Sequence, residues 1–299
     1  MARRKKGPVG VIGLGIMGGA FAKNLVSAGW RVIGYDIDVG RRRALARVGV
    51  EIAPSPAAVA ATAAVVITSL PNPQALHDVA AEIAAAKLRK IVLVEASTFT
   101  LEDKVAAERT LKRAGHTVLD CPVSGTGAQA KTGDLVVYAS GESAAIKKLR
   151  PMFLSFARAV DDLGAYGNGS RMKYVANLLV AIHNVASAEA MVLGIKAGLP
   201  PQRIFDLVRS GAGNSRVFEL RAPMMVKDDY EDATMKIKVW QKDLDVIGSY
   251  AAKIGCPTPL MSATLPIYAA AMATGHAMHD TAAVCAVLES MAGVRRKRK

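Results

Sequence analysis

The stretch that decides the fold is Val9-Gly10-Val11-Ile12-Gly13-Leu14-Gly15-Ile16-Met17-Gly18. An apolar run typical of a buried strand leads into the pattern G-x-G-x-x-G, and a helical stretch follows. In this setting the first glycine permits a tight turn, the second lets a pyrophosphate approach the backbone, and the third lets the helix pack on the strand. Free N–H groups at the helix start favour phosphates. The pattern predicts a dinucleotide site at Gly13, Leu14, Gly15, Ile16, Met17 and Gly18.

The next predicted strand ends in the acidic residue that such a site requires, Asp36, which follows Gly13 by 23 residues. A carboxylate there accepts hydrogen bonds from the ribose of NAD and repels the 2′-phosphate of NADP. Arg41, Arg42 and Arg43 follow closely and soften this preference. We therefore expect NAD rather than NADP as the cofactor. The alternative is a purely structural glycine turn, which only lets a helix pack on a strand.

Short apolar runs alternate with helical stretches through the first half of the chain. The predicted strands cover residues 9–14, 31–36, 65–70, 91–95, 117–121, 134–139 and 159–162. The predicted helices there include residues 16–28, 101–113 and 143–153. Such alternation predicts an α/β, Rossmann-type domain over residues 1–164, with a parallel, doubly wound sheet.

The character of the sequence changes after Gly164. Residues 168–196 have helical periodicity without a proline, and they predict one long interdomain helix. Further helices are predicted over residues 202–210, 234–253, 259–273 and 280–291, with Asp280 as an N-cap. Because no strand pattern of comparable strength occurs, we expect residues 165–299 to form an all-α domain that includes the long helix.

Composition and charge exclude several classes of protein. The chain has 299 residues, 51% of them hydrophobic, so a disordered protein is excluded. The formal charge is +14, but nine basic residues lie at the two ends and leave 14 − 9 = +5 for the body. We expect solvated, disordered ends and no need for nucleic acid as a partner. These end residues are Arg3, Arg4, Lys5, Lys6, Arg295, Arg296, Lys297, Arg298 and Lys299.

The cysteines and the apolar runs bear on the compartment. Cys121, Cys256 and Cys285 are far apart and form no CxxC or Cys/His cluster, so no metal site is expected. A low, odd number of cysteines favours a reducing compartment. The N-terminal apolar run is too short for a signal peptide, and the apolar residues 57–70 are too few to span a bilayer. We therefore expect a cytoplasmic protein without a membrane partner.

Two further segments carry candidate chemistry. Residues 120–128 combine hydroxyl side chains with paired glycines, which suits a carboxylate ligand but is also typical of a polar turn. Lys173 and Asn177 are spaced i, i+4 and share one helix face, after the helix entry Gly167-Asn168-Gly169-Ser170. A lysine beside a carbonyl can donate a proton as hydride arrives, although a lone helix lysine is usually a solvated cation.

Together these segments resemble the β-hydroxyacid dehydrogenase family, which includes 3-hydroxyisobutyrate, tartronate semialdehyde, glyoxylate/succinic semialdehyde and threonate enzymes. The matching segments are residues 9–18 with Asn24-Leu25, residues 120–127, Gly167-x-Gly169-x-x-x-Lys173-x-x-x-Asn177, and Lys242-Asp243-Leu244. They occur in the family's order and spacing between about residues 9 and 292. The resemblance implies hydride transfer between NAD(P) and a short β-hydroxy acid or its semialdehyde, without a metal, by a homodimer or homotetramer.

The resemblance also implies a role for each matching residue. Lys173 would be the general acid and base, and Asn177 would hold the substrate. Lys242 would reach the cofactor, and Asp243 would support its helix. The implied substrate-binding residues are Ser124, Gly125 and Thr126, and the implied cofactor-site residues outside the glycine-rich turn are Leu70, Pro71 and Thr98.

One departure from the family and three alternatives remain. The family usually has Ser-Gly-Gly where this chain has Ser124-Gly125-Thr126, so Thr126 would narrow the pocket or contact a substrate hydroxyl. Residues 213–221 resemble the threonate-type and related sugar-acid branches more than the valine-pathway enzyme. The alternatives are an imine-reducing relative, a decarboxylating relative and a non-enzymatic relative that binds chromatin or nucleic acid. Lys173 argues against the first alternative, and the intact pair of Lys173 and Asn177 argues against the last.

Overall fold

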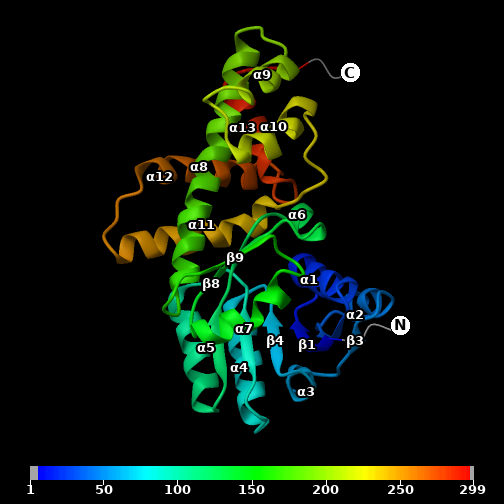
Figure 1. Cartoon of the computed structure of the whole chain (residues 1–299). Helices are drawn as coiled ribbons and strands as arrows, with labels where there is room; N and C mark the ends of the chain where they lie inside the picture. The colour runs from blue at the N-terminus through cyan, green and yellow to red at the C-terminus, as the bar shows by residue number, and fades with distance from the viewer. Residues whose placement is uncertain (1–5, 297–299) are drawn as a thin grey trace. The chain divides into compact units, whose positions relative to one another are not determined.

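The computed structural model describes residues 6–296, and the chain forms two compact units, Met1–Lys173 and Tyr174–Lys299. Figure 1 colours the first unit from blue to green and the second from green to red. The boundary falls in the second turn of the long helix α8 (Asn168–Lys196), which has the bounds predicted from the sequence.

Six parallel strands form the central sheet of the first unit, in the order β3-β2-β1-β4-β5-β6. They are β1 (Lys6–Ile12), β2 (Trp30–Tyr35), β3 (Glu51–Ile52), β4 (Val65–Thr68), β5 (Val92–Glu95) and β6 (Thr117–Asp120). The predicted parallel, doubly wound sheet is thereby confirmed. Ile12 ends β1 and is in register with Tyr35 of β2 and Thr68 of β4. The strand order reverses between β1 and β4, and open parallel sheets bind ligands at the carboxyl ends of the strands at such a point.

Five helices connect these strands. They are α1 (Ile16–Ser27), α2 (Val39–Ala46), α3 (Pro56–Thr62), α4 (Pro73–Ala85) and α5 (Leu101–Arg113). Four of them begin after a side chain that accepts a backbone hydrogen bond, namely Asp38, Ser55, Asn72 and Thr100. Such caps satisfy N–H groups that the first helical turn leaves unpaired. The exception is α1, which begins after Gly15 without a capping side chain.

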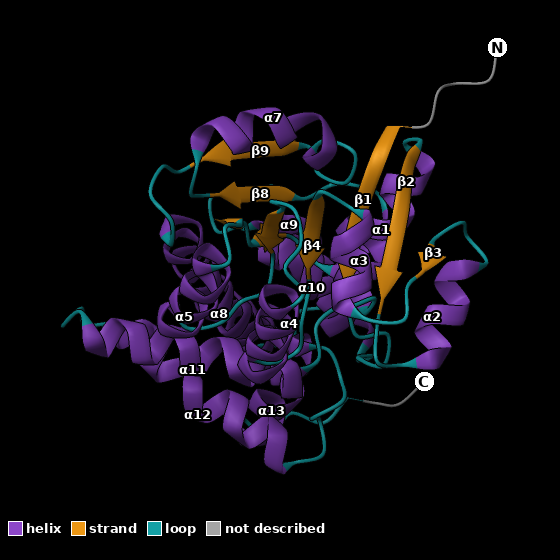
Figure 2. Ribbon diagram, turned by 90° about the horizontal axis from the view of Figure 1, so that it is seen from below, coloured by secondary structure: helices purple, strands orange, loops and turns teal. Residues whose placement is uncertain are grey.

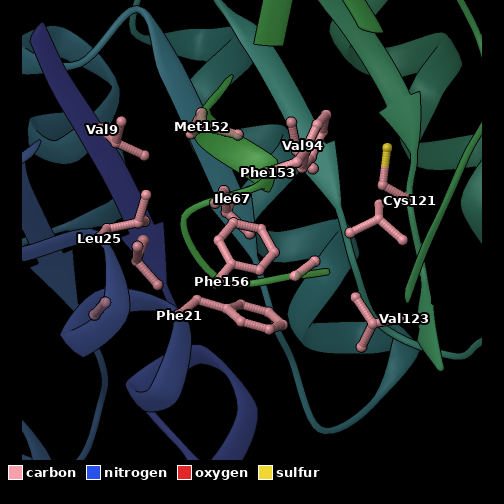
Figure 3. Close-up of a cluster of buried hydrophobic side chains, with 14 of the residues drawn as sticks. Val9, Phe21, Leu25, Ile67, Val94, Cys121, Val123, Met152, Phe153 and Phe156 are labelled. Carbon is pink, nitrogen blue, oxygen red and sulfur yellow. The ribbon is translucent and has the colours of Figure 1, made fainter. Parts of the chain in front are cut away.

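The core of the first unit consists of two apolar clusters that the sheet separates. Val94 and Leu119 belong to one cluster, and their chain neighbours Leu93 and Val118 belong to the other. This alternation follows from the pleat of a strand that is covered on both faces. In the first cluster, drawn in Figure 3, the ring of Phe21 lies 4.6 Å from that of Phe156.

A second, three-stranded sheet follows in the chain. Its strands are β7 (Val123–Ser124), β8 (Val136–Ala139) and β9 (Ala159–Asp162), and it includes an antiparallel pair, β7–β8. The helices α6 (Gly127–Lys131) and α7 (Ser143–Phe153) belong to this region, and α7 runs along β9 in Figure 2. A two-way backbone pairing of Asp120 with Ser140 joins the end of β6 to this sheet. The sequence predicted β8, β9 and α7, but not the short β3, β7 and α6.

In the second unit the described residues form helices. After α8 come α9 (Pro201–Val208), α10 (Arg216–Lys227), α11 (Ile237–Lys253), α12 (Pro259–Ala273), the 3₁₀ turn η1 (Thr281–Ala283) and α13 (Val284–Met291). The predicted all-α character is confirmed. Helix α10 was not predicted, and it contains Pro223 in its interior, which in a sequence argues against a helix.

A buried carboxylate explains why α11 begins three residues later than predicted. Asp280 Oδ2 accepts hydrogen bonds from the backbone N–H groups of Thr234 at 2.8 Å and Met235 at 3.2 Å. The same carboxylate pairs with Arg221 at 2.7 Å and caps η1 through the N–H of Ala282 at 3.0 Å. The predicted N-cap role of Asp280 is confirmed. Its bonds to residues 234 and 235 hold that segment outside the helix.

Helix α8 is the one helix among residues 6–296 that is long and apolar enough to cross a membrane by length and composition alone. The best window has a mean hydropathy of 1.7, and 39% of it is buried. A core helix passes the same test, so this is weak evidence for a membrane span. The expectation above, which considered residues 57–70, overlooked this segment.

The basic ends differ in part from expectation. Lys6 begins β1 and lies 5.3 Å from the ring centroid of Trp30. Arg296 donates from Nε to Glu289 at 2.6 Å and from Nη1 to the carbonyl oxygen of Met225 at 2.6 Å. Lys6 is exposed but ordered, and Arg296 is ordered and partly buried, so the expectation of disordered ends is wrong for these two residues. Residues 1–5 and 297–299 lie outside the described residues.

Candidate active site

The glycine-rich turn joins β1 to α1, and two of its glycines are required by close backbone contacts. Gly13 has φ +88°, and a Cβ there would lie 2.1 Å from the carbonyl oxygen of Ser69. A Cβ on Gly18 would lie 1.9 Å from the carbonyl oxygen of Gly13. Both contacts are far too short for a side chain. These glycines therefore let β1, β4 and α1 pack closely at the point where the strand order reverses.

Gly15 differs because the space beside it is open. A Cβ there would meet no atom closer than Nη1 of Arg41, at 3.7 Å. Helix α1 begins directly after Gly15 without a capping side chain, and Ile16 is 66% exposed. A pyrophosphate can approach such a backbone and accept from the first N–H groups of the helix. The turn therefore fits the phosphates of NAD(P).

Asp36 follows β2 and is 5% exposed. Its Oδ2 accepts from the N–H of Leu14 at 2.7 Å, and its Oδ1 accepts from the N–H of Asp38 at 2.8 Å. Arg41 approaches Oδ2 at 3.4 Å. The carboxylate thus braces the glycine-rich turn, a structural role in addition to the ribose contact expected from the sequence. Each carboxylate oxygen can accept more than one hydrogen bond, so these contacts leave Asp36 able to accept from a ribose hydroxyl.

The loops after β4 and β5 are bound to each other. The N–H of Leu70 donates to Oγ of Ser97 at 2.9 Å, and the N–H of Ser97 donates to Oε1 of Glu95 at 2.8 Å. Pro71 and Thr98 are the next residues of these loops. The structure therefore brings the predicted cofactor residues after β4 and β5 to one edge of the sheet, the edge that also carries the glycine-rich turn.

The predicted substrate segment forms the turn from β7 into α6. Gly125 has φ +134°, a conformation that side-chain-bearing residues rarely adopt. Thr126 is the N-cap of α6, and its backbone N–H donates to Oε1 of Gln129 at 3.0 Å, which completes a capping box. The departure from the family's Ser-Gly-Gly thus has a local structural use. Asn24 of α1 donates to the carbonyl oxygen of Ala130 at 2.7 Å and ties α6 to the cofactor helix.

Helix α8, which carries Lys173, starts against the end of β6. A Cβ on Gly169 would lie 2.6 Å from the carbonyl oxygen of Asp120, so only glycine permits this approach. Asp120 accepts from the N–H of Ser170 at 2.7 Å and from its hydroxyl at 2.8 Å. Lys173 follows Ser170 by three residues and is half-buried. This contact puts the start of α8 at the carboxyl edge of the sheet.

A buried lysine, Lys104, lies next to the same carboxylate. Its Nζ is 2.6 Å from Oε2 of Glu95 and 2.7 Å from Oδ1 of Asp120, and all three side chains are at most 1% exposed. Burial lowers the pKa of Lys104, but the charges and hydrogen bonds of Asp120 and Glu95 outweigh burial, so its pKa lies above the usual value. The two carboxylates therefore favour the charged form of Lys104.

In the second unit, Asn177, Asp243 and Lys242 form one hydrogen-bonded group. The side-chain amide of Asn177, which is 4% exposed, donates to Oδ2 of Asp243 at 2.9 Å. Nζ of Lys242 lies 2.8 Å from Oδ1 of the same carboxylate. Asp243 thus contacts one residue of each of two predicted functional segments.

Sequence reasoning missed the roles of Glu95, Lys104 and Ser170. Glu95 and Asp120 end neighbouring strands at the ligand edge of a parallel sheet, and that placement was a usable signal. Lys104 offered none, because a lysine in an amphipathic helix is expected to face solvent. Among residues 6–296 there is no group of three or more His, Cys, Asp or Glu arranged to hold a metal ion.

Comparisons with known proteins agree with this geometry. Residues 8–164 match the family model described as the NAD binding domain of 6-phosphogluconate dehydrogenase. Residues 167–288 match the one described as NAD-binding of NADP-dependent 3-hydroxyisobutyrate dehydrogenase. L-threonate dehydrogenase of Cupriavidus necator is 35% identical over 92% of this chain and 94% of its own length.

Solved structures give the same result. A 3-hydroxyisobutyrate dehydrogenase from Salmonella typhimurium has a TM-score of 0.85 and 29% identity, over 94% of this chain and 100% of that one. The Mycobacterium tuberculosis 3-hydroxyisobutyrate dehydrogenase with L-serine also has a TM-score of 0.85 and 29% identity, over 94% of this chain and 99% of that one.

The fold, the glycine-rich turn and the carboxyl-edge loops define an NAD(P)-dependent oxidoreductase. The chain belongs to the β-hydroxyacid dehydrogenase family, as its two domain matches and its relatives show. It acts on the CH–OH group of small hydroxy acids with NAD(P). The non-enzymatic, imine-reducing and decarboxylating alternatives are not favoured by these findings.

Proposed function

We propose that this chain oxidises a short β-hydroxy acid with NAD, and reduces the matching semialdehyde in the reverse direction, with Lys173 as general acid and base. The observation that carries the proposal is the bond of Asp120 to Ser170, which starts α8 at the carboxyl edge of the sheet. Lys173 follows within one helical turn. A lysine at that edge is in reach of a substrate bound beside the nicotinamide.

The chain's own residues have the following roles in this proposal. In oxidation, Nζ of Lys173 accepts the hydroxyl proton of the substrate while the carbinol carbon loses a hydride. In reduction, its ammonium protonates the developing alkoxide. The bound nicotinamide accepts or supplies the hydride. Asn177 holds the substrate, and the Ser124, Gly125 and Thr126 segment binds the substrate carboxylate through N–H and hydroxyl groups.

Two features support the proposed substrate and the proposed cofactor. The relationship to L-threonate dehydrogenase supports a short sugar acid of the threonate type. Asp36, buried against the glycine-rich turn, supports NAD over NADP because its charge opposes a 2′-phosphate. Leu70, Pro71, Thr98 and Lys242 complete the proposed cofactor contacts. We further propose that the protein is cytoplasmic and forms a homodimer or homotetramer. Light scattering on the purified chain tests the oligomeric state.

The test follows the absorbance of reduced nicotinamide with NAD and NADP. The alcohols are L-threonate, D-glycerate, 3-hydroxyisobutyrate, 4-hydroxybutyrate and L-serine, and the reverse assay uses succinic and tartronate semialdehydes and glyoxylate. Lys173→Ala should lower kcat by about 10²–10⁴-fold, the usual contribution of general acid–base catalysis. Lys173→Arg should be similarly slow because arginine does not give up its proton.

Lys196→Ala, in the last turn of the same helix, is the matched control and should keep wild-type turnover. Unchanged turnover in Lys173→Ala would show that the lysine has been assigned wrongly. Cofactor binding by the wild-type chain without turnover of any compound tested would refute the proposed substrate class.

A further inference from the structure

Lys104 of α5 is fully buried and lies between two buried carboxylates. Its ammonium nitrogen is 2.6 Å from Glu95 and 2.7 Å from Asp120. Lysine is almost never fully buried unless it is paired, and here one cation faces two anions. The proposed reaction gives this lysine no direct role, so its burial calls for another explanation.

The two carboxylates end neighbouring strands. Glu95 is the last residue of β5, Asp120 is the last residue of β6, and the two are directly paired in the parallel register. Like charges held side by side inside a protein repel each other strongly. Lys104, on the helix that connects the two strands, contacts both carboxylates and offsets their repulsion.

Glu95 orders the loop that follows β5. Its Oε1 accepts from the N–H of Ser97 at 2.8 Å, and Oγ of Ser97 accepts from the N–H of Leu70 at 2.9 Å. Two successive hydrogen bonds therefore connect the loop after β4 to Ser97, in the loop after β5, and Ser97 to Glu95. Both loops belong to the edge at which dinucleotides bind.

Asp120 orders the first turn of α8. Its Oδ2 accepts from the N–H of Ser170 at 2.7 Å and from Ser140 Oγ at 3.3 Å, and Ser140 Oγ in turn accepts from the N–H of Gly169 at 2.9 Å. One cation against two anions leaves one negative charge, which the positive end of the α8 dipole complements. A shift of this turn moves Lys173, because Lys173 follows Ser170 by three residues.

We propose that Lys104 is a positioning residue that couples the Ser97 loop to the first turn of α8, so that cofactor binding and the placement of Lys173 depend on one buried cation. This inference rests on the proposed function and deepens it. Without the cation, the repulsion between the paired carboxylates is no longer offset, and both segments lose their fixed acceptors. A misplacement of about 1 Å is enough to lower turnover about 100-fold.

The first test compares Lys104→Met with Lys112→Met, a matched control that removes a 58% exposed lysine from the same helix. Lys104→Met should raise the Kd for NAD about 10-fold and lower kcat at saturating cofactor about 100-fold. Lys112→Met should leave both unchanged. Thermal unfolding checks that both proteins are folded. Equal Kd and kcat values for folded Lys104→Met and the wild type would overturn the proposal.

The second test separates coupling from a general loss of stability. Ser97→Ala should mainly raise the Kd for NAD, and Ser170→Ala should mainly lower kcat. In the double variant Ser97→Ala/Ser170→Ala, the fold-changes of Kd and kcat should differ by about three-fold or more from the products of the fold-changes in the two single variants. Such a departure is expected for residues in one network. The background Lys104→Met/Glu95→Gln removes one positive and one negative charge, so it can replace Lys104→Met if that variant does not fold. In this background the effects of Ser97→Ala and Ser170→Ala should become multiplicative. Multiplicative effects in the wild-type background would refute the coupling.

A third readout needs no substrate. In Lys104→Met, backbone hydrogen exchange should become faster in peptides covering residues 96–99 and residues 168–173, with the Lys112→Met pattern unchanged. If neither segment changes, or only one, the coupling is wrong. Wild-type turnover in Lys173→Ala would instead refute the proposed function, and the exchange result would still decide the structural coupling.

Discussion

Asn177 of α8 donates its side-chain amide to Asp243 of α11 at 2.9 Å, across 66 residues of sequence in the second unit. The other oxygen of Asp243 lies 2.8 Å from the ammonium of Lys242. Asn177 and Asp243 are both buried, so their orientation is set by this contact. Because the amide nitrogen of Asn177 is committed to Asp243, the carboxylate determines how Asn177 presents its carbonyl oxygen.

Loss of the Asp243 carboxylate should therefore disturb both of its partners. Asp243→Ala leaves a buried amide without its acceptor, and we expect kcat/KM to fall about 10-fold and the free energy of unfolding to fall by about 1–3 kcal/mol. Steady-state kinetics and denaturant unfolding measure the two effects. Asp245→Ala, an exposed acid on the same helix, is the control and should change neither quantity. Equal effects of the two variants would contradict a specific role of Asp243.

The cofactor preference should depend on Asp36. Replacing it by Ser removes the charge that opposes a 2′-phosphate and leaves Arg41 without this partner. We expect Asp36→Ser to lower the ratio of kcat/KM for NAD to that for NADP by about 10-fold or more. Asp38→Ser is the matched control, because Ser can also cap α2. A ratio that changes equally in both variants would remove Asp36 from the specificity assignment.

The free energy of unfolding should depend on pH through His276. Burial and the nearby charge of His279 lower the pKa of His276 from its ordinary value of 6.5. The folded state therefore favours neutral His276. Its contribution to the free energy of unfolding is fully present above pH 6.5 and is lost as the pH falls through the lower folded-state pKa. Denaturant unfolding between about pH 7 and pH 5 should give a smaller decrease for His276→Gln than for the wild type. Identical slopes would contradict this origin.

The glycine-rich turn should tolerate no side chain at Gly18. A Cβ there would lie 1.9 Å from the carbonyl oxygen of Gly13, so the backbone must shift. We expect Gly18→Ala to lower the free energy of unfolding by about 1–3 kcal/mol and to weaken NAD binding. Gly7→Ala, at an open position in β1, is the control and should change neither. A stable Gly18→Ala that binds NAD normally would refute the packing argument.

Local signals accounted for much of this fold. The apolar strands, the G-x-G-x-x-G turn and α8 follow from side-chain periodicity and from glycine, which act over a few residues. The sequence alone did not reveal α10, because Pro223 lies inside it and tertiary packing outweighs the local preference. It also did not reveal the capping role of Thr126, which depends on a five-residue helix too short to have a periodic pattern.

By itself the sequence determined the class of fold, the cofactor turn and the candidate lysine, because each of these is encoded by neighbouring residues. The tertiary structure alone decided that Lys104 is a buried cation rather than a solvated one, and that Asp120 fixes the start of α8. Lys104, Asp120 and Ser170 are separated by 16 and 50 residues, and nothing local marks them as partners. Their pairing arises only when a parallel sheet brings two strand ends together, and the low polarity of the interior then makes a cation between them necessary.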